Sequence, residues 1–358
     1  MVQQAVRQRL AARDAALSPF AMRETTSLGR TLPEEAPSLR GEYQRDRDRI
    51  VHSKAFRRLK HKTQVFIAPA GDHFVTRLTH TLEVAQVGRT IARALNLNED
   101  LVEAMALGHD LGHTPFGHVG EQALDHLSPG GFRHSQQSLR VVDLLEKEGE
   151  GLNLTRETRQ GILNHSKPRD DLLRLESDDL TLETQVCRLA DAVAYINHDI
   201  GDALRAGLIQ QEDLPRQAVA LLGQRHSERI NTLVVDIVES SWAATGEVPL
   251  SPETRPAITM SPPVAQAVNL LREFMFQAVY IPASSGPEGV VANRLINLLY
   301  HHFLQHPQEL PSALAKEDQP LEQRVVDHVA SMTDQFALLL AERSWPGSTD
   351  RVFSGRLL

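Results

Sequence analysis

Residues 108–121 read GHDLGHTPFGHVGE, and this stretch decides how the rest of the chain is interpreted. It holds three histidines, one aspartate and one glutamate within fourteen residues. Gly112 and Pro115 interrupt a helical pattern, and His118 and Glu121 resume it three residues apart, on one helix face. A dense cluster of such side chains across a helix break indicates a metal site with an acid–base pair beside it. The alternative is a set of solvated histidines on an exposed turn.

Two further helical patterns bring candidate ligands to the adjacent pair His109 and Asp110. Residues 77–95 are amphipathic, and His80 lies near the edge of their apolar stripe. Alone, His80 is more typical of a core histidine, but an antiparallel helix pair would lay it beside His109. Asp191 lies in a long, mostly apolar helical pattern, where burial of a carboxylate is costly unless it meets a cation. It is therefore predicted to be the fourth ligand.

The composition is that of an ordinary globular protein of 358 residues, with 41% hydrophobic and 23% charged residues. A net charge of −8 argues against a non-specific nucleic-acid coat, although it allows a local basic pocket. The single cysteine, Cys187, excludes an internal disulfide and fits a reducing compartment. We find no signal-peptide pattern, and no apolar run near the roughly 18 residues of a membrane span. We therefore expect a soluble, cytoplasmic protein with no membrane contact.

Helical periodicity dominates, so we predict an all-α fold with at most a short β-hairpin near residues 64–76. Residues 1–40 are expected to form a helix and an arm, residues 41–210 a catalytic core, and residues 211–358 a helical region that packs on the core and provides oligomer contacts. Residues 42–60 read as one helix. The basic run from Arg57 to Lys62 is either a solvated face or a source of cationic donors.

Four blocks of this sequence, in order, carry a resemblance to a known family. The series His80, His109–Asp110 and Asp191 resembles the H…HD…D pattern of the HD superfamily of metal-dependent phosphohydrolases. DRDRIVHSKAFRRLKHKTQVF, TRLTHTLEVAQVGR, GHDLGHTPFGHVGE and ADAVAYINHDIGDAL are similar to its deoxyguanosine-triphosphate triphosphohydrolase-like branch. Together the blocks span roughly residues 45 to 205, and the helices beyond are similar more loosely. The resemblance implies a mostly helical HD-domain fold.

The resemblance also assigns roles to individual residues of this chain. One divalent ion per subunit would be bound by His80, His109, Asp110 and Asp191. Catalysis would fall to the dyad of His118 and Glu121, with His113 and His134 lining the phosphate pocket. Substrate would be bound by Arg77 at the phosphate and by Gln64, Tyr195 and Asp199 around the deoxyribose. In the sequence, Asp191, Tyr195 and Asp199 are four residues apart, which places them on one stripe of a helix.

Two imidazoles and two carboxylates suit Mn²⁺ or Mg²⁺, with Fe²⁺ and Zn²⁺ as alternatives that ligand type does not separate. We expect hydrolysis of deoxynucleoside triphosphates (dNTPs) to a deoxynucleoside and inorganic triphosphate, with cationic donors from Arg77 and the run Arg57 to Lys62. The alternatives are another HD phosphohydrolase, namely a nucleotide monophosphatase or phosphodiesterase, or a non-catalytic regulator that binds nucleotides or nucleic acid. The expected partners are the dNTP, further copies of the chain in a homo-oligomer such as a hexamer, and a nucleotide effector or single-stranded DNA.

Overall fold

The computed structural model describes residues 2–67, 73–166, 180–251, 254–314, 319–349 and 352–353, and the predicted all-α class is confirmed. Within these ranges the β pairings are two isolated bridges, Arg30 with Thr155 and Thr63 with Thr76. The expected hairpin near residues 64–76 therefore amounts to one bridge at its base, and residues 68–72 lie outside the described part. None of the described helices combines the length and the apolar character that crossing a bilayer requires.

The chain forms two compact units built from interleaved segments, and the first comprises Met1–His52, Thr81–His109 and Asn153–Phe274. Its elements are α1 (Val2–Ala15), η1 (Glu24–Thr26), α2 (Glu42–Val51), most of α4 (Arg77–Ala94), α5 (Glu99–Gly108), α8 (Arg156–Leu163), α9 (Leu182–Arg205), η5 (Gln211–Asp213), α10 (Arg216–Leu222), α11 (His226–Ser240), η6 (Trp242–Thr245) and most of α12 (Pro262–Met275). The predicted domain boundaries at residues 40 and 210 rest on the sequence alone and stay a prediction.

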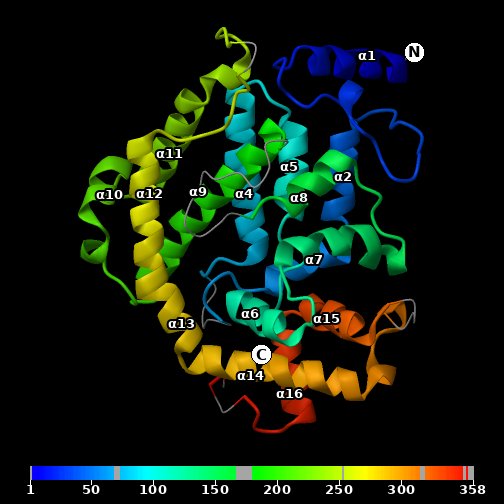
Figure 1. Ribbon diagram of the computed structural model, residues 1–358, viewed down its shortest axis with the longest axis vertical. Coiled ribbons are helices and arrows are strands. Elements are labelled where there is room, and N and C mark those ends of the chain that lie inside the picture. Colours follow the sequence, from blue (N-terminus) through cyan, green and yellow to red (C-terminus); the bar gives the residue numbers. More distant parts are fainter. Residues whose placement is uncertain are drawn as a thin grey trace. The chain divides into compact units, whose positions relative to one another are not determined.

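Helix α9 is the centre of the first unit, where it packs against α5, α8 and α11 (Figure 1). Its start is fixed by Thr181, whose side chain accepts a hydrogen bond from the amide of Thr184. Gly88 of α4 allows α4, α5 and α9 to approach closely, because a Cβ at this position would lie 2.7 Å from a Val102 methyl group and 3.4 Å from Ala190 Cβ. Asp191 therefore lies on a helix that is held on several sides.

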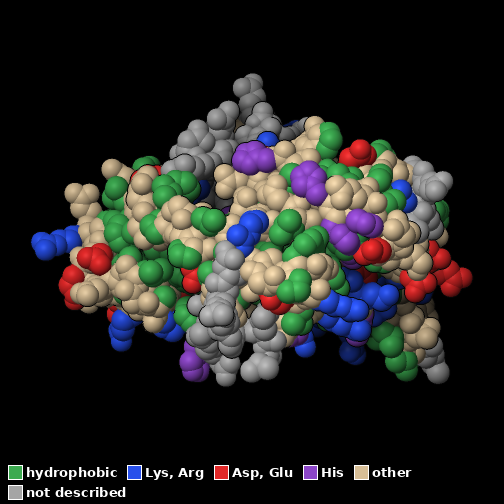
Figure 2. Space-filling view, turned by 90° about the horizontal axis from the view of Figure 1, so that it is seen from below, with side chains coloured by type: hydrophobic (Ala, Val, Ile, Leu, Met, Phe, Trp, Pro, Cys, Tyr) green, Lys and Arg blue, Asp and Glu red, His purple; other side chains and the backbone are tan. Residues whose placement is uncertain are grey.

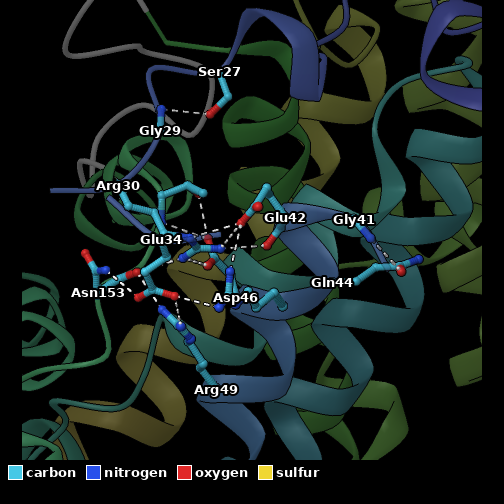
Figure 3. Close-up of polar contacts among 12 residues, drawn as sticks. Ser27, Gly29, Arg30, Glu34, Gly41, Glu42, Gln44, Asp46, Arg49 and Asn153 are labelled. Carbon is cyan, nitrogen blue, oxygen red and sulfur yellow. Dashed lines mark hydrogen bonds and ion pairs between the residues drawn. The ribbon is translucent and has the colours of Figure 1, made fainter. Parts of the chain in front are cut away.

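The arm that follows α1 is fastened to α2 by a network of charged side chains (Figure 3). The buried Arg30 guanidinium lies 2.6 Å from a Glu42 carboxylate oxygen and 2.5 Å from one of Asp46. Glu34 accepts hydrogen bonds from Arg49 and from the Asn153 amide. Buried, multiply bonded ion pairs hold their partners in one geometry. The arm is thus an integral part of the first unit.

The second unit comprises Ser53–His80, Asp110–Leu152 and Met275–Leu358. Its elements are α3 (Lys54–Arg58), η2 (Leu59–His61), the first turn of α4, α6 (Gly117–Leu127), α7 (His134–Arg140), η3 (Val141–Leu145), η4 (Lys147–Gly149), η7 (Phe276–Tyr280), α13 (Ile281–Ser285), α14 (Pro287–Gln305), η8 (Pro307–Glu309), η9 (Ser312–Leu314), α15 (Leu321–Ser331) and α16 (Asp334–Ser344). Helix α14 packs against α6, α15 and α16 (Figure 1). Phe116, Leu124, Leu295 and Val329 belong to the core between these helices.

The helix expected over residues 42–60 is broken, because α2 ends at Val51 and α3 begins at Lys54. The side chain of Ser53 accepts a hydrogen bond from the amide of Phe56 over 3.1 Å and so starts the second helix. Serine competes with a continuing helix in this way at N-cap positions. The apolar periodicity of residues 42–60 spans the break, which explains why the sequence reads as one helix.

Candidate active site

The pair His109–Asp110 lies where helix α5 ends. Asn98 caps the start of α5 by accepting from the amide of Leu101, and the helix ends at Gly108. A Cβ at position 108 would lie 2.7 Å from a methyl group of Ile162, so only glycine fits without a shift at this end of the helix. The boundary between the two units falls between His109 and Asp110. Of the predicted metal ligands, His109 and Asp191 therefore belong to the first unit and His80 and Asp110 to the second, and each pair is described within its unit.

In the first unit, His109 faces Asp191 of helix α9. The Nδ1 atom of His109 lies 2.7 Å from the carbonyl oxygen of Ala106, so Nδ1 carries the proton and donates it. The other ring nitrogen, Nε2, lies 3.9 Å from Asp191 Oδ1. Two ligands of one ion, each at about 2.1 Å, are at most about 4.2 Å apart. The tautomer and the spacing both fit a shared cation.

In the second unit, His80 and Asp110 form a similar pair. His80 Nε2 lies 4.0 Å from Asp110 Oδ2, and both side chains are buried. Asp110 Oδ2 also accepts a hydrogen bond from Arg77 Nη1 over 2.7 Å. Arg77 is thus held in place by Asp110, which is itself a predicted metal ligand. The contact of Arg77 with a phosphate group stays a prediction. The peptide bond between His109 and Asp110 links the two halves covalently.

Glu121, in helix α6, is the centre of a cluster of three histidines. His134 donates from Nδ1 to Glu121 Oε1 over 2.7 Å, and its backbone amide donates to the same oxygen over 2.8 Å. The rings of His113 and His118 each place one nitrogen 3.7 Å from Glu121 Oε2. The close partner of Glu121 is therefore His134, thirteen residues away, rather than His118, its predicted partner in the dyad. His118 is also the exposed member, with 66% of its side chain accessible.

Burial and charge set opposite protonation states within this cluster. Burial raises the pKa of Glu121, but the neighbouring His134, His118 and His113 lower it by more than burial raises it. The resulting pKa of Glu121 is well below the usual value. Burial lowers the pKa of His134, but Glu121 and Asp110 outweigh it and the net pKa is raised. Burial, Arg77 and His134 hold the pKa of His113 well below its usual value. At neutral pH a neutral His113 therefore stacks on a more basic His134, with ring centroids 4.6 Å apart.

Asp110, His113 and His134 form a compact group of buried or half-buried donors in the second unit. Their ligand atoms lie within 4.8 Å of one another, so that one metal ion can be reached by all three. Histidine side chains also appear at several places on the surface shown in Figure 2, so histidine content does not locate the site.

The predicted sugar-binding residues are divided between the units. In the second unit, the side-chain oxygen of Gln64 is buried and accepts no hydrogen bond from the described residues. In the first unit, Tyr195 is half-buried and hydrogen-bonds Arg272, and Asp199 is buried 2.8 Å from His198 Nδ1. Whether these three residues surround one deoxyribose stays a prediction.

Comparison with known proteins identifies the family. Residues 77–196 match the HD domain family and residues 258–343 match the phosphohydrolase-associated domain family. A protein of Caldanaerobacter subterraneus subsp. tengcongensis is 50% identical over 328 residues, which cover 90% of each chain. One of Desulfatibacillum aliphaticivorans is 46% identical over 332 residues, covering 90% of this chain and 92% of the relative. Both are named deoxyguanosinetriphosphate triphosphohydrolase-like protein.

The chain belongs to the deoxyguanosinetriphosphate triphosphohydrolase-like family of HD-domain phosphohydrolases. The HD match includes all four predicted metal ligands and the cluster around Glu121. HD domains bind divalent metal ions, and the buried histidines and aspartates described above are suitable ligands. The predicted family resemblance is therefore confirmed.

Sequence reasoning missed several residues of this family member that lie beside the site. The buried His165 ring packs edge-on against His109, with centroids 4.8 Å apart, and Arg272 contacts Tyr195. Lys62 was expected among the cationic donors for phosphate, which is wrong, because its amino group is buried and donates to two backbone carbonyls. No spacing rule could have found these contacts, since each depends on segments distant in sequence.

Proposed function

We propose that this protein hydrolyses deoxynucleoside triphosphates to a deoxynucleoside and inorganic triphosphate. A water oxygen would form a bond to the α-phosphorus, the bond from this phosphorus to the 5′ oxygen would break, and a proton would be delivered to the 5′ oxygen. The observation that carries the proposal is the cluster of three histidines on Glu121, next to Asp110. Family membership supports the same substrate class, since the relatives are named for deoxyguanosine triphosphate.

His80, His109, Asp110 and Asp191 would hold one divalent ion, with Mn²⁺ or Mg²⁺ first and Fe²⁺ or Zn²⁺ as alternatives. The fit rests on the chemistry of the donors, which are two imidazoles and two carboxylates, and on the tautomer of His109, whose Nδ1 donates to Ala106. When bound, such an ion supplies Lewis acidity and positive charge toward the phosphate oxygens.

The histidines around Glu121 would handle the protons and part of the phosphate charge. His113, with its lowered pKa, is neutral and can accept a proton from the attacking water. His134, with its raised pKa, can carry positive charge and stabilise the phosphate oxygens as negative charge develops. His118, the exposed member, would deliver a proton to the leaving 5′ oxygen, with Glu121 orienting its ring.

Substrate recognition would use Arg77, Gln64, Asp199 and Tyr195. Arg77 would contact the phosphate while it holds Asp110 in place. Gln64 can both donate to and accept from a 3′ hydroxyl, and Asp199 can accept from it. Tyr195 would lie against C2′, where the added hydroxyl of a ribonucleotide would clash. The site would therefore select deoxyribose over ribose.

We expect the enzyme to work in the cytoplasm as a homo-oligomer, with a hexamer as the first expectation. A nucleotide effector or single-stranded DNA would be a further partner. The test of function is an incubation of the purified full chain with each dNTP and Mn²⁺, read by anion-exchange chromatography. Triphosphate as product supports the proposal. Orthophosphate or pyrophosphate indicates another HD phosphohydrolase, and tight binding without turnover indicates a regulator.

A further inference from the structure

Two buried charged residues of the second unit take no part in the proposed reaction. Lys62 is 2% exposed and Asp334 is 3% exposed. Burial of an ammonium group or a carboxylate is costly unless hydrogen bonds replace the lost water. The hydrogen bonds of both residues lead to the loop at residues 113–116, which carries His113 and precedes helix α6.

Lys62 connects this loop to the end of helix α15. Its amino group donates to the backbone carbonyl of His113 and to that of Ala330, the latter over 2.8 Å. The ring of the same His113 lies 3.7 Å from Glu121. Lys62 therefore fixes the backbone of a candidate catalytic histidine without touching its ring, and it is not available to contact substrate.

Asp334, at the start of helix α16, holds the other end of the loop. Its Oδ1 accepts from the amide of Phe116 over 3.0 Å, and its Oδ2 accepts from the hydroxyl of Thr63 over 2.6 Å and from the Thr63 amide over 3.2 Å. Since Thr63 follows Lys62 in the chain, the hydrogen bonds of Lys62 and Asp334 form a closed network. This network joins three segments, residues 62–63, 113–116 and 330–334.

The loop needs such support because its backbone is strained where α6 begins. Phe116 has φ +63°, a left-handed conformation that residues other than glycine rarely adopt. Such conformations persist when the surroundings fix them. Gly117 follows with φ +57°, and a Cβ there would come within 3.0 Å of the carbonyl oxygen of Gln64. The next residue in the chain is His118, so the turn at Phe116 sets the direction in which His118 and Glu121 point.

We propose that Lys62 and Asp334 are positioning residues that hold the loop at residues 113–116 and thereby align His113, His118 and Glu121 for catalysis. The phosphohydrolase-associated segment, residues 258–343, thus contributes to the active site through Ala330 and Asp334. The effect on catalysis rests on the proposed function, whereas the effect on the loop does not. A purely structural role would instead lower stability and leave the loop and the turnover of the folded protein unchanged.

The experiment compares Asp334→Ala, Asp334→Asn and Lys62→Met in the full chain, loaded with Mn²⁺. Asp46→Asn is the matched control, because Asp46 is also buried and accepts from the amide and the hydroxyl of one threonine, Thr155, over 2.9 and 2.6 Å. Hydrogen exchange of the peptide spanning residues 113–117 is measured by mass spectrometry, well below the melting temperature. The values of kcat and KM for dGTP are measured on the same samples.

For Asp334→Ala and Lys62→Met we expect exchange of residues 113–117 at least about tenfold faster, and kcat lower by about 10²-fold with KM changed less than about threefold, since a misplacement near 1 Å can cost this much. Asp334→Asn, which keeps one acceptor, should fall between Asp334→Ala and the wild type. Asp46→Asn should match the wild type in both readouts even if its melting temperature falls.

Unchanged exchange at residues 113–117 in the folded Asp334 variants would overturn the proposal, as would an equal loss of kcat in Asp46→Asn. Asp334→Asn keeps the test decisive if the alanine or methionine variant does not fold. If the wild type hydrolyses no dNTP, the proposed function fails, and hydrogen exchange alone then decides whether Lys62 and Asp334 hold the loop.

Discussion

At the scale of single residues, Asp110 is a buried carboxylate that contacts both a predicted metal ligand and a predicted phosphate-binding residue. It is 3% exposed, lies 4.0 Å from His80 and accepts a hydrogen bond from Arg77. Asp110→Ala should abolish both metal content and turnover while the protein stays helical. Mass spectrometry of the bound metal and circular dichroism measure these properties. Stoichiometric metal in the variant would show that Asp110 is not a ligand.

His118→Ala is the matched variant, for which we expect turnover to fall while the metal is retained. His118 lies 3.7 Å from Glu121 and is not among the predicted ligands. The variant should retain its metal and its affinity for substrate, and turnover should fall by about 10²–10⁴-fold, the usual contribution of a general acid or base. A rate near that of the wild type would transfer the proton-transfer role to His113 or His134.

Lys62 gives a prediction for the pH dependence of stability. Burial and, to a smaller extent, the charge of Arg58 lower the pKa of Lys62 from its usual 10.5 to about 7, although the charge of Asp334 acts in the opposite direction. Between these values the unfolded chain binds the extra proton, so the free energy of unfolding rises with pH, by up to about 1.4 kcal/mol per pH unit. Below about pH 7, the titration of Lys62 no longer changes the free energy of unfolding.

The measurement is chemical denaturation of the wild type and Lys62→Met between pH 7 and 9.5. The free energy of unfolding of the wild type should increase relative to that of Lys62→Met as the pH rises, because the variant lacks the titrating group. A difference that stays constant over this range would mean that Lys62 titrates normally in the folded protein.

At the scale of elements, helix α9 is predicted to carry both metal binding and sugar selection. Tyr195 and Asp199 follow Asp191 by one and two turns, about 6 and 12 Å along the axis. Tyr195→Ala should raise the ratio of kcat/KM for GTP to that for dGTP by at least about tenfold, because the ring would no longer exclude the 2′ hydroxyl. Asp199→Ala should weaken both substrates, since each has the 3′ hydroxyl.

Tyr195→Phe is the control for this prediction, because it keeps the ring and removes only the hydroxyl group that reaches Arg272. Its selectivity should stay close to that of the wild type. If the wild type hydrolyses GTP as well as dGTP, sugar selection by Tyr195 is wrong whatever the variants do.

Elements with strong local signals were predictable from sequence. The periodicity of residues 77–95 corresponds to α4, and the long helix with Asp191 corresponds to α9. The break before α3 was not predicted, because one serine cap at Ser53 outweighs an apolar pattern that continues across it. Leu82, an apolar residue within the 77–95 pattern, is 51% exposed, since periodicity does not say which flank of a helix is covered.

At the scale of the whole molecule, the sequence indicates candidate reactive residues but not the residues that support them. The candidate ligands and the cluster around Glu121 are found because histidines and carboxylates are rare at such density. The close contact of Glu121 with His134 and the support by Asp334 join residues 13 and 218 positions apart. Such contacts follow from the packing of the second unit, which no local pattern specifies. The C-terminal third, where residues 258–343 match the phosphohydrolase-associated domain family, thereby supplies Asp334 to the loop beside the site.

The most direct test of the central claim is hydrolysis of dGTP by the Mn²⁺-loaded full chain in ¹⁸O-labelled water, with both products analysed by mass spectrometry. Attack of water on the α-phosphorus places one ¹⁸O in inorganic triphosphate and leaves deoxyguanosine unlabelled. Label in the 5′ hydroxyl of deoxyguanosine would mean attack at carbon, and labelled orthophosphate or pyrophosphate would mean cleavage at another phosphorus. Either result would contradict attack of water on the α-phosphorus, which is the central claim.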